Sequence, residues 1–422
     1  MLSATANPQF EVRTATEKDL DALVAFNGRV FRPPAGVWTR SLLRGGRPGT
    51  SIRHFLVLED RATAQIVASL CMLLQEWNLG GVSIPVSQME LVGTDPNFRG
   101  RGFMRMQAMR LAQMERAERC LLSCVQGVPG LYQKFGYEYA IPLKGGTWIS
   151  LEKFAGCGSS RIPQPGRVLS FRRAVPADYP ALVPFYTEAT RSMLVSSSRT
   201  AALWAYQDGQ PNDSEHAIET YVLEQGARIV GYFRLRHSSR LNAMVLREAQ
   251  AQTWDGWWTA LKAAFEAAAA SGFNSLLLQL PRTNPLHQTA QYAGGDEIPP
   301  FAWQVKVLDW VEFLNRIAPA LEARMAASLF ANWTGSIVVR LRDATTLHIC
   351  FDQGRLKVRA DGQAGASDGV DATVGMFTQL AFGYRSSEDL LRSHPDFRVA
   401  RSIHFALDTL FPKLPSYIYE TY

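Results

Sequence analysis

The segment VGTDPNFRGRGFMRMQAMRLAQ, residues 92–113, decides how this chain is interpreted. A strand end leads into a glycine-rich turn at residues 99–102, and a helical pattern follows. Backbone N–H groups at such a helix start are free, and the helix dipole favours an anion there. Four arginines and no acidic residue lie between residues 97 and 113. The segment therefore predicts a site for a phosphate-bearing ligand.

Two common phosphate motifs do not fit this segment. A P-loop requires Gly-Lys-Ser/Thr, which the chain lacks. A dinucleotide fingerprint requires a third glycine, and Arg105 stands where it belongs after Gly100 and Gly102. The ligand is therefore expected to belong to another class.

The composition indicates a globular protein with several domains. The chain has 422 residues, of which 47% are hydrophobic and 19% charged, which suggests two or three folded domains rather than disorder. The net charge of +6 comes from arginines that are spread along the chain, so no nucleic-acid partner is expected. The five cysteines form no C-x-x-C pair and the seven histidines no H-E-x-x-H motif, so no metal site is expected either.

No membrane association is expected from the sequence. The longest apolar stretch, IVASLCMLL at residues 66–74, is shorter than a membrane span. The N-terminal residues lack both the basic and the apolar region of a signal peptide. These observations predict a cytoplasmic protein.

Two segments of the chain repeat one pattern. Residues 10–26, FEVRTATEKDLDALVAF, align with residues 169–185, LSFRRAVPADYPALVPF, so that Asp19 matches Asp178 and Leu23 matches Leu182. A duplicated module is the simplest explanation. The Gly-, Ser- and Pro-rich stretch at 156–167 indicates a linker. We expect three domains, at 1–157, 158–298 and 299–422, the first two mixed α/β and the third α+β with a long helix over 310–330.

The glycine-rich loop resembles the acetyl-CoA pyrophosphate loop of the GNAT N-acetyltransferases, R/Q-x-x-G-x-G/A. Arg99 and Gly102 match that pattern, and Met104 replaces its final small residue. The later segment GLYQKFGYEYA, residues 130–140, resembles the family's L-Y-x-x-x-G-[FY] segment, in which the tyrosine protonates the departing thiolate. The resemblance implies that Tyr132 is the general acid. It also implies that acetyl-CoA is bound by Leu91, Val92, Thr94, Arg99, Gly100, Arg101, Gly102, Phe103 and Met104.

The whole chain resembles the Eis-like (enhanced intracellular survival) acetyltransferases. The domain order matches, and residues 371–386, DATVGMFTQLAFGYRS, resemble the sterol-carrier-like C-terminal domain of that family. The resemblance implies tandem GNAT folds, with mixed and mostly antiparallel sheets flanked by helices, and a homo-oligomer, specifically a hexamer. It also implies that the terminal carboxylate, here that of Tyr422, is the catalytic base. Glu90 on the preceding strand and an ordered water remain alternatives.

The resemblance places the acceptor between the first two helices, the strand before the loop and the C-terminus. A primary amine of a small molecule, aminoglycoside-like or a polyamine, would then lie against Phe26, Phe31, Trp38, Glu90 and Glu420. Residues 26–38, FNGRVFRPPAGVW, carry Arg29 and Arg32 and no acid, which departs from members that bind polycations. The sterol-carrier resemblance leaves one other class open, a carrier of an apolar ligand or a CoA-binding protein in which the GNAT modules are scaffold.

Overall fold

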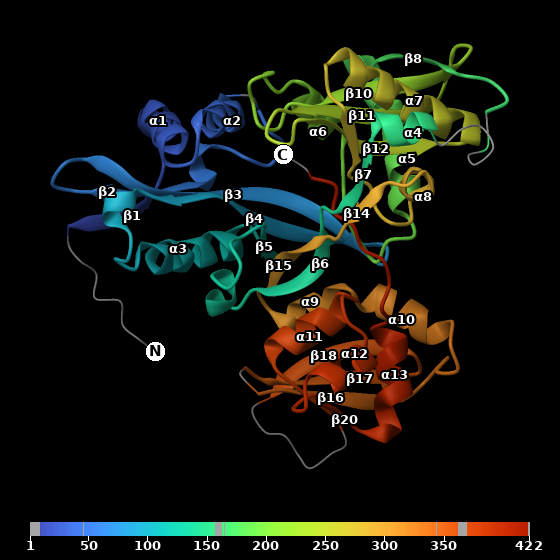
Figure 1. Cartoon of the computed structure of the whole chain (residues 1–422). Coiled ribbons are helices and arrows are strands. Elements are labelled where there is room, and N and C mark those ends of the chain that lie inside the picture. Colours follow the sequence, from blue (N-terminus) through green and yellow to red (C-terminus); the bar gives the residue numbers. More distant parts are fainter. Residues whose placement is uncertain are drawn as a thin grey trace.

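The computed structural model describes residues 9–44, 46–156, 163, 165–342, 344–361 and 369–420. The expected fold class is confirmed, because three mixed or antiparallel sheets, each flanked by helices, make up the described chain. Figure 1 shows the N-terminal part in blue, a second part in green and yellow, and a third in orange and red. None of the helices in these ranges combines the length and apolar character needed to span a membrane.

The first sheet carries the predicted site. Helices α1 (Leu20–Val30) and α2 (Pro33–Arg44) cover one face, and α3 (Phe103–Ala117) covers the other (Figure 1). Its strand β4 pairs with β3 in antiparallel and with β5 in parallel orientation. In spatial order the sheet consists of β1 (Phe10–Thr14), β2 (Phe55–Asp60), β3 (Gln65–Leu79), β4 (Val82–Thr94), β5 (Leu122–Val125), β15 (Phe301–Val307) and β6 (Glu138–Leu143).

The second sheet repeats the parallel pair of the first. Strands β12 (Ala243–Ala251) and β13 (Ser275–Leu278) are parallel, and the alanine-rich helix α7 (Trp254–Ala270) connects them. The other strands are β14 (Asp296–Ile298), β7 (Gly146–Ser150), β11 (Arg228–Ser238), β10 (Glu219–Gln225) and β8 (Ser170–Arg173). Helices α4 (Leu151–Gly156), α5 (Tyr179–Thr190), α6 (Ala201–Asp208) and α8 (Pro285–Tyr292) surround this sheet.

The third sheet has the described order β18 (Arg355–Asp361), β17 (Thr346–Asp352), β16 (Gly335–Leu341), β19 (Gly369–Ala372) and β20 (Arg398–Val399). The single helix expected over 310–330 is wrong. The chain forms α9 (Trp310–Arg316) and α10 (Ala318–Ala326), since Pro319 at the second position of α10 lacks the N–H needed to continue one helix. Helices α11 (Val374–Ala381), α12 (Ser387–Ser393) and α13 (His404–Leu410) complete this part.

The sheets exchange strands across the boundaries expected from the sequence. Strand β15 follows residue 298 in the chain, yet it lies in the first sheet between β5 and β6. Strand β7 precedes residue 157 but pairs within the second sheet. The short strand β9 (Val195–Ser197) pairs with β3. Each of the three expected domains therefore contributes a strand to the sheet of another domain.

The aligned segments at the start of the two modules share one local geometry. Arg13 donates two hydrogen bonds to Asp19, with N–O distances of 2.8 and 2.7 Å. Arg172 does the same to Asp178 at 2.7 and 3.0 Å. Each carboxylate also accepts a backbone N–H three residues earlier, which caps the turn that leads into the helix.

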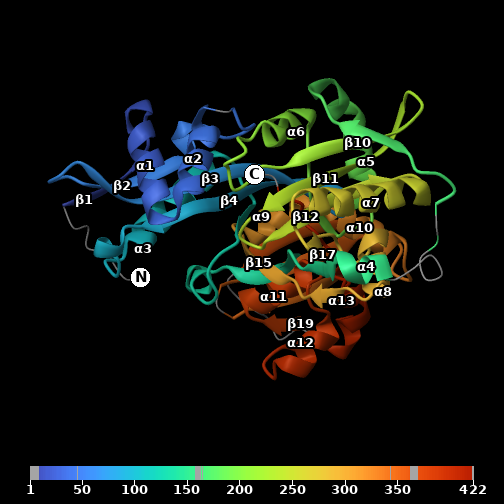
Figure 2. The ribbon, with the colours of Figure 1, turned by 45° about the horizontal axis from the view of Figure 1, so that its top comes forward.

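The C-terminal tail leaves the third part and crosses to the first two. The N–H of Leu194 donates to the carbonyl of Pro415 at 2.7 Å, and the N–H of Tyr417 donates to the carbonyl of Val195 at 3.0 Å. Tyr417 and Tyr419 are buried, with their rings 4.8 Å apart. Both views show the last described residues close to β3 and α6 (Figure 1 and Figure 2).

Candidate active site

A β-bulge lies in β4 where the sequence predicts cofactor contacts. Ser69 of β3 pairs with Gly93 and Cys71 pairs with Glu90, so two residues of β4 stand opposite one of β3. Leu91 takes a left-handed conformation at φ 51°, and the Ser69 hydroxyl donates to its carbonyl at 3.1 Å. A side chain with a Cβ is unfavourable in that conformation, and bulges with such strain redirect backbone groups next to functional sites.

The two parallel strands part beside this bulge. Pairing between β4 and β5 ends where Met89 stands opposite Val125. In the described chain, β4 continues to Thr94 with β3 as its only pairing neighbour. Backbone groups of Val92 and Thr94 on the open side can therefore pair with an extended ligand, as an added strand would.

The glycine-rich loop closes one end of this opening. Gly100 and Gly102 have φ values of 77° and 79°, and a Cβ on either would meet no atom within 4 Å. Backbone conformation rather than crowding thus requires glycine. Among the described residues, the N–H groups from Gly100 to Met104 have no acceptor, and they lie at the start of the 15-residue helix α3. This arrangement fits a pyrophosphate.

The arginine and phenylalanine side chains of the loop have distinct positions. Arg99 is exposed, and its Nε donates a long hydrogen bond of 3.4 Å to the carbonyl of Thr94. The guanidinium of Arg101 lies 5.1 Å from the ring centre of Phe98. Phe103 is buried against Phe10, so its backbone and not its side chain faces the loop. Met104 is half-buried and packs at the edge of the cluster that contains Tyr132.

Tyr132 lies in a short helical turn at residues 132–135, after β5, and is 5% exposed. Its ring covers Gly127, where a Cβ would come within 2.1 Å of two ring carbons. Gln304 of β15 donates to the carbonyl of Gly127 at 3.0 Å and so supports this contact from the inserted strand. Burial, and in addition the nearby Glu90 carboxylate, raises the pKa of Tyr132 to about 12. The phenol is therefore protonated at neutral pH.

Glu90 belongs to a polar row on the face of the sheet below α1 and α2. The side-chain amide of Gln88 donates to Glu90, and that of Gln75 donates to Gln88. Trp77 donates from Nε1 to Gln75 at 2.9 Å. Because Glu90 acts on the pKa of Tyr132, the two predicted proton-transfer groups are electrostatic neighbours.

The predicted acceptor residues divide into buried and accessible ones. Phe26 and Trp38 are both 2% exposed and belong to the core below α1 and α2. Phe31 is 41% exposed, and its ring lies over Gly93, where a Cβ would approach it within 2.8 Å. The outer side of Trp38 meets His216 of the second module at a ring distance of 4.3 Å. The second module therefore forms part of this wall.

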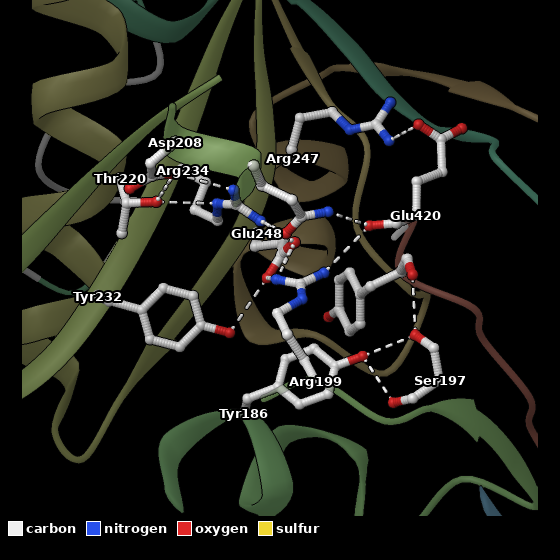
Figure 3. Close-up of polar contacts among 12 residues, drawn as sticks. Tyr186, Ser197, Arg199, Asp208, Thr220, Tyr232, Arg234, Arg247, Glu248 and Glu420 are labelled. Atoms are coloured by element: carbon white, nitrogen blue, oxygen red, sulfur yellow. Dashed lines mark hydrogen bonds and ion pairs between the residues drawn. The ribbon is translucent and has the colours of Figure 1, made fainter. Parts of the chain in front are cut away.

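The tail brings Glu420 to the same region, whereas Tyr422 lies outside the described residues. The backbone carbonyl of Glu420 accepts hydrogen bonds from Arg199 at 3.2 Å and Gln207 at 2.9 Å. Its carboxylate pairs with Arg247 (Figure 3). It also pairs with Lys144 at 3.5 Å. Burial alone would raise the pKa of Glu420, but these cations keep it well below its ordinary value. The carboxylate is already engaged by protein cations.

A buried ionic network behind Glu420 was not predicted from the sequence. Arg199 and Arg234 both contact Glu248, at 2.7 and 3.1 Å, and Arg234 also contacts Asp208 at 3.0 Å (Figure 3). Burial would raise the pKa of Glu248, and the two arginines lower it below its usual value. The only sequence signal is that Tyr232, Arg234 and Arg236 alternate along one strand and so share a face.

The comparisons with known proteins agree with this geometry. Residues 11–140 match the family profile described as an acetyltransferase (GNAT) domain. A search of curated proteins gives no match.

Several solved structures share the fold over the whole length of the chain. A conserved protein of Enterococcus faecalis V583, described as a probable N-acyltransferase, has 15% identity and a TM-score of 0.74, with 98% of this chain and 100% of that one covered. A GCN5-related N-acetyltransferase of Anabaena variabilis ATCC 29413 has 14% identity and a TM-score of 0.71, with 97% and 99% covered. Eis1 of Mycobacterium abscessus has 14% identity and a TM-score of 0.61, with 98% and 100% covered. At these identities the structures establish a common fold. The matched range contains the bulge, the loop and Tyr132, so residues 11–140 form an acetyltransferase (GNAT) domain.

Proposed function

We propose that the protein transfers the acetyl group of acetyl-CoA directly to a primary amine of a small molecule. The observation that carries this proposal is the convergence of three features: the N–H groups of Gly100 to Met104 without acceptors among the described residues, the open edge of β4, and the protonated Tyr132 in the turn after β5. A scaffold without activity would have no use for all three.

The cofactor would lie along the opening between β4 and β5. The loop N–H groups and Arg99 bind the pyrophosphate, and the β4 backbone at Leu91, Val92 and Thr94 binds the pantetheine arm. When bound, acetyl-CoA supplies an acetyl group activated as a thioester. Met104 is half-buried in the cluster behind the loop, so the larger side chain at this position packs into the protein.

Two proton transfers accompany the reaction. The neutral amine attacks the thioester carbon, the C–S bond breaks, and Tyr132 donates its phenolic proton to the leaving sulfur. The nitrogen loses a proton to a base, for which we propose the Tyr422 carboxylate. Glu90 beside Tyr132 and an ordered water are the alternatives. Phe31, with its exposed ring over Gly93, borders the position of the amine.

The test measures CoA release from acetyl-CoA against a broad amine panel, with product masses. We expect Tyr132→Phe to lower kcat by roughly 10²- to 10⁴-fold, while Tyr292→Phe, at a 66% exposed tyrosine, keeps wild-type activity. Two variants distinguish the candidate bases: Glu90→Gln removes one of them, and a chain extended past Tyr422 displaces the other, the terminal carboxylate. Full activity of the extended chain would exclude the terminal carboxylate. Absence of CoA release with every amine, together with no bound CoA, would contradict the function itself.

The finer family features are part of the same proposal. The duplicated Arg–Asp pairs and the repeated parallel strand pair support tandem GNAT modules. We further propose a sterol-carrier-like third domain, a homo-oligomer, specifically a hexamer, and a cytoplasmic location. Light scattering of the purified full chain tests the hexamer, and a monomer mass would contradict it.

A second candidate function has one observation in its favour. A cavity of about 340 Å³, large enough for a small ligand, lies where the three parts meet. Most of its lining is apolar, including Met193, Leu280, Ile298, Phe382 and Leu414. Native mass spectrometry of the purified protein would separate a carrier, which retains an apolar ligand, from an enzyme, which retains CoA.

A further inference from the structure

We propose that the acceptor carries an anionic group, a carboxylate or a phosphate, beside its amine, and that Arg236 binds this group. The inference rests on the proposed function and names the substrate class of the same site. The expected acceptor therefore bears a negatively charged group, unlike a polycation.

The pocket in question lies between the second module and the tail. It has a volume of about 30 Å³, which is room for a carboxylate group or about two water molecules. It is lined by Gln207, His216, Ile218, Arg234, Arg236, Arg247, Glu248 and Glu420. Three of these side chains are guanidinium groups on neighbouring strands.

In the described part of the chain, two of the three guanidinium groups that line the pocket form ion pairs with carboxylates, and one does not. Arg234 contacts Glu248 and Asp208, and Arg247 contacts Glu420. Arg236 is half-buried, and within the described ranges it has neither a hydrogen bond nor an ion pair. A guanidinium withdrawn from water without a carboxylate is costly. On this proposal the missing partner is an anion supplied by a ligand.

The surroundings give this pocket a positive potential. Burial, then Arg247 and Arg32, lowers the pKa of Arg236, although Glu420 and Glu215 act in the opposite direction. Burial and nearby cations likewise lower the pKa of His216 to about 3, although Glu420 opposes them, so its ring is neutral at pH 7. A bound anion would relieve this excess charge.

The pocket adjoins the predicted acceptor wall. Glu420 lines it directly, and His216 extends from it to the ring of Trp38. Glu215 pairs with Arg32 in the segment between α1 and α2. Arg29, in the last turn of α1, is paired in the same way with Asp95 at 3.2 Å, so among the described residues the positive charge in this region that has no carboxylate partner is that of Arg236. A polycation would be repelled here, and an anionic group attracted.

Binding of the anion also orients the amine. A guanidinium presents paired N–H donors to a carboxylate or phosphate, which fixes direction as well as distance. An acceptor fixed at one end loses the rotational freedom that would separate its amine from the thioester. We therefore expect Arg236 to act mainly on KM for the acceptor, with a smaller effect on kcat.

The experiment compares matched amines with and without the anion. The pairs are phenylalanine with phenethylamine, tryptophan with tryptamine, and phosphoethanolamine with ethanolamine. Wild type is measured beside Arg236→Gln and Arg236→Lys, with Arg228→Gln as control, since Arg228 is exposed at the start of the same strand. We expect wild type to prefer the anionic member of a pair. Arg236→Gln should lose roughly 10- to 100-fold of that preference, Arg236→Lys should lose less, and the control none.

The outcomes distinguish this inference from the proposed function. Acetylation of the neutral amines with no preference for the anion, unchanged in Arg236→Gln, overturns the inference and leaves the function standing. No acetylation of any amine by wild type overturns both. If a preference appears only when the chain is cut after Glu420, its own terminal carboxylate is the partner of Arg236, and the inference is overturned.

Discussion

Burial gives Tyr132 both its position and its protonation state. Among the described residues the phenol has no hydrogen-bond partner, so its proton is available for transfer in the proposed reaction. With a pKa of about 12, it also stays protonated well above neutrality. In the proposed reaction a weaker acid transfers its proton with less driving force, but the proton stabilises the thiolate leaving group as soon as it moves.

The pH dependence of kcat follows from this pKa. An ordinary tyrosine would lose its proton near pH 10, whereas the raised pKa moves this loss above the range in which the enzyme can be assayed. We expect no fall in kcat up to about pH 10.5 that is due to the acid. The measurement is a pH profile with saturating substrates, with circular dichroism at each pH to confirm folding. A descending limb near pH 9 in the folded wild type, absent from Tyr132→Phe, would contradict the assignment.

Gly127 is a second residue whose substitution has a definite expected result. A Cβ at this position would meet the Tyr132 ring at 2.1 Å, so either the ring or the backbone would have to move. Gly127→Ala should therefore displace Tyr132, lower kcat at least about tenfold, and cost roughly 1–3 kcal/mol of unfolding free energy. Gly156→Ala is the control, because a Cβ there has no neighbour within 4 Å. Equal kinetics for the two variants would mean that the ring position does not matter.

At the residue scale, sequence reasoning works where a local motif fixes the backbone. The turn at Gly100 and Gly102 requires positive φ, and a motif of adjacent residues records that need. No such motif marks Arg236, because arginines are usually exposed. Whether a carboxylate pairs with Arg236 depends on segments that are distant in the sequence. The left-handed conformation of Leu91 could not be predicted from the sequence either, because a bulge depends on the register with β3.

At the scale of elements, the paired Arg–Asp caps predict an acid-labile fold. Hydrogen bonds from Arg13 lower the pKa of Asp19 to about 2, and those from Arg172 lower the pKa of Asp178. A carboxyl whose pKa is lower in the folded state stabilises fully above its unfolded pKa, near 3.9, and loses this contribution as pH falls through the folded pKa. The contribution of Asp19 is thus lost between about pH 4 and pH 2.

Asp19→Asn and Asp178→Asn test this at the first turn of each module. Each should lower the unfolding free energy at pH 7 by roughly 1–2 kcal/mol, through loss of the cap, and should flatten the decline of Tm below about pH 4. Asp21→Asn, at an exposed side chain two residues away, is the control. Thermal melts from pH 7 to pH 3 give the answer, and wild-type-like acid sensitivity in both variants would show that other carboxylates dominate.

The elements themselves were largely predictable, and their partners were not. Apolar residues that alternate between two turns indicate a strand over residues 82–94, and these are the bounds of β4. The same pattern in β15 indicates a strand but not the sheet to which it belongs, because a strand's periodicity describes its two faces and not its neighbours. The division of the helix at Ile317 was visible in Pro319, one of the clearest breakers in the segment.

At the scale of the whole molecule, the exchange of strands makes the parts dependent on one another. A fragment of residues 1–157 would lack β15, which is the only described strand that pairs with β6 and which contributes the buried Trp303 and Gln304. We expect this fragment to be insoluble or to lack near-ultraviolet circular dichroism, and not to bind CoA. Its co-expression with residues 158–422 should restore a soluble, folded protein that binds CoA. A fragment that folds and binds CoA alone would contradict this view.

The position of β15 also has a consequence for synthesis in the cell. Strand β6 leaves the ribosome long before β15, and at 5–20 residues per second the interval from Leu143 to Phe301 is roughly 10–30 s. During this time the edges of β5 and β6 stay unpaired, which invites aggregation or chaperone binding. Stalled nascent chains that end before residue 301 should therefore be protease-sensitive in the catalytic region, and chains with Val307 beyond the ribosome resistant. The first domain to be made is thus among the last to mature.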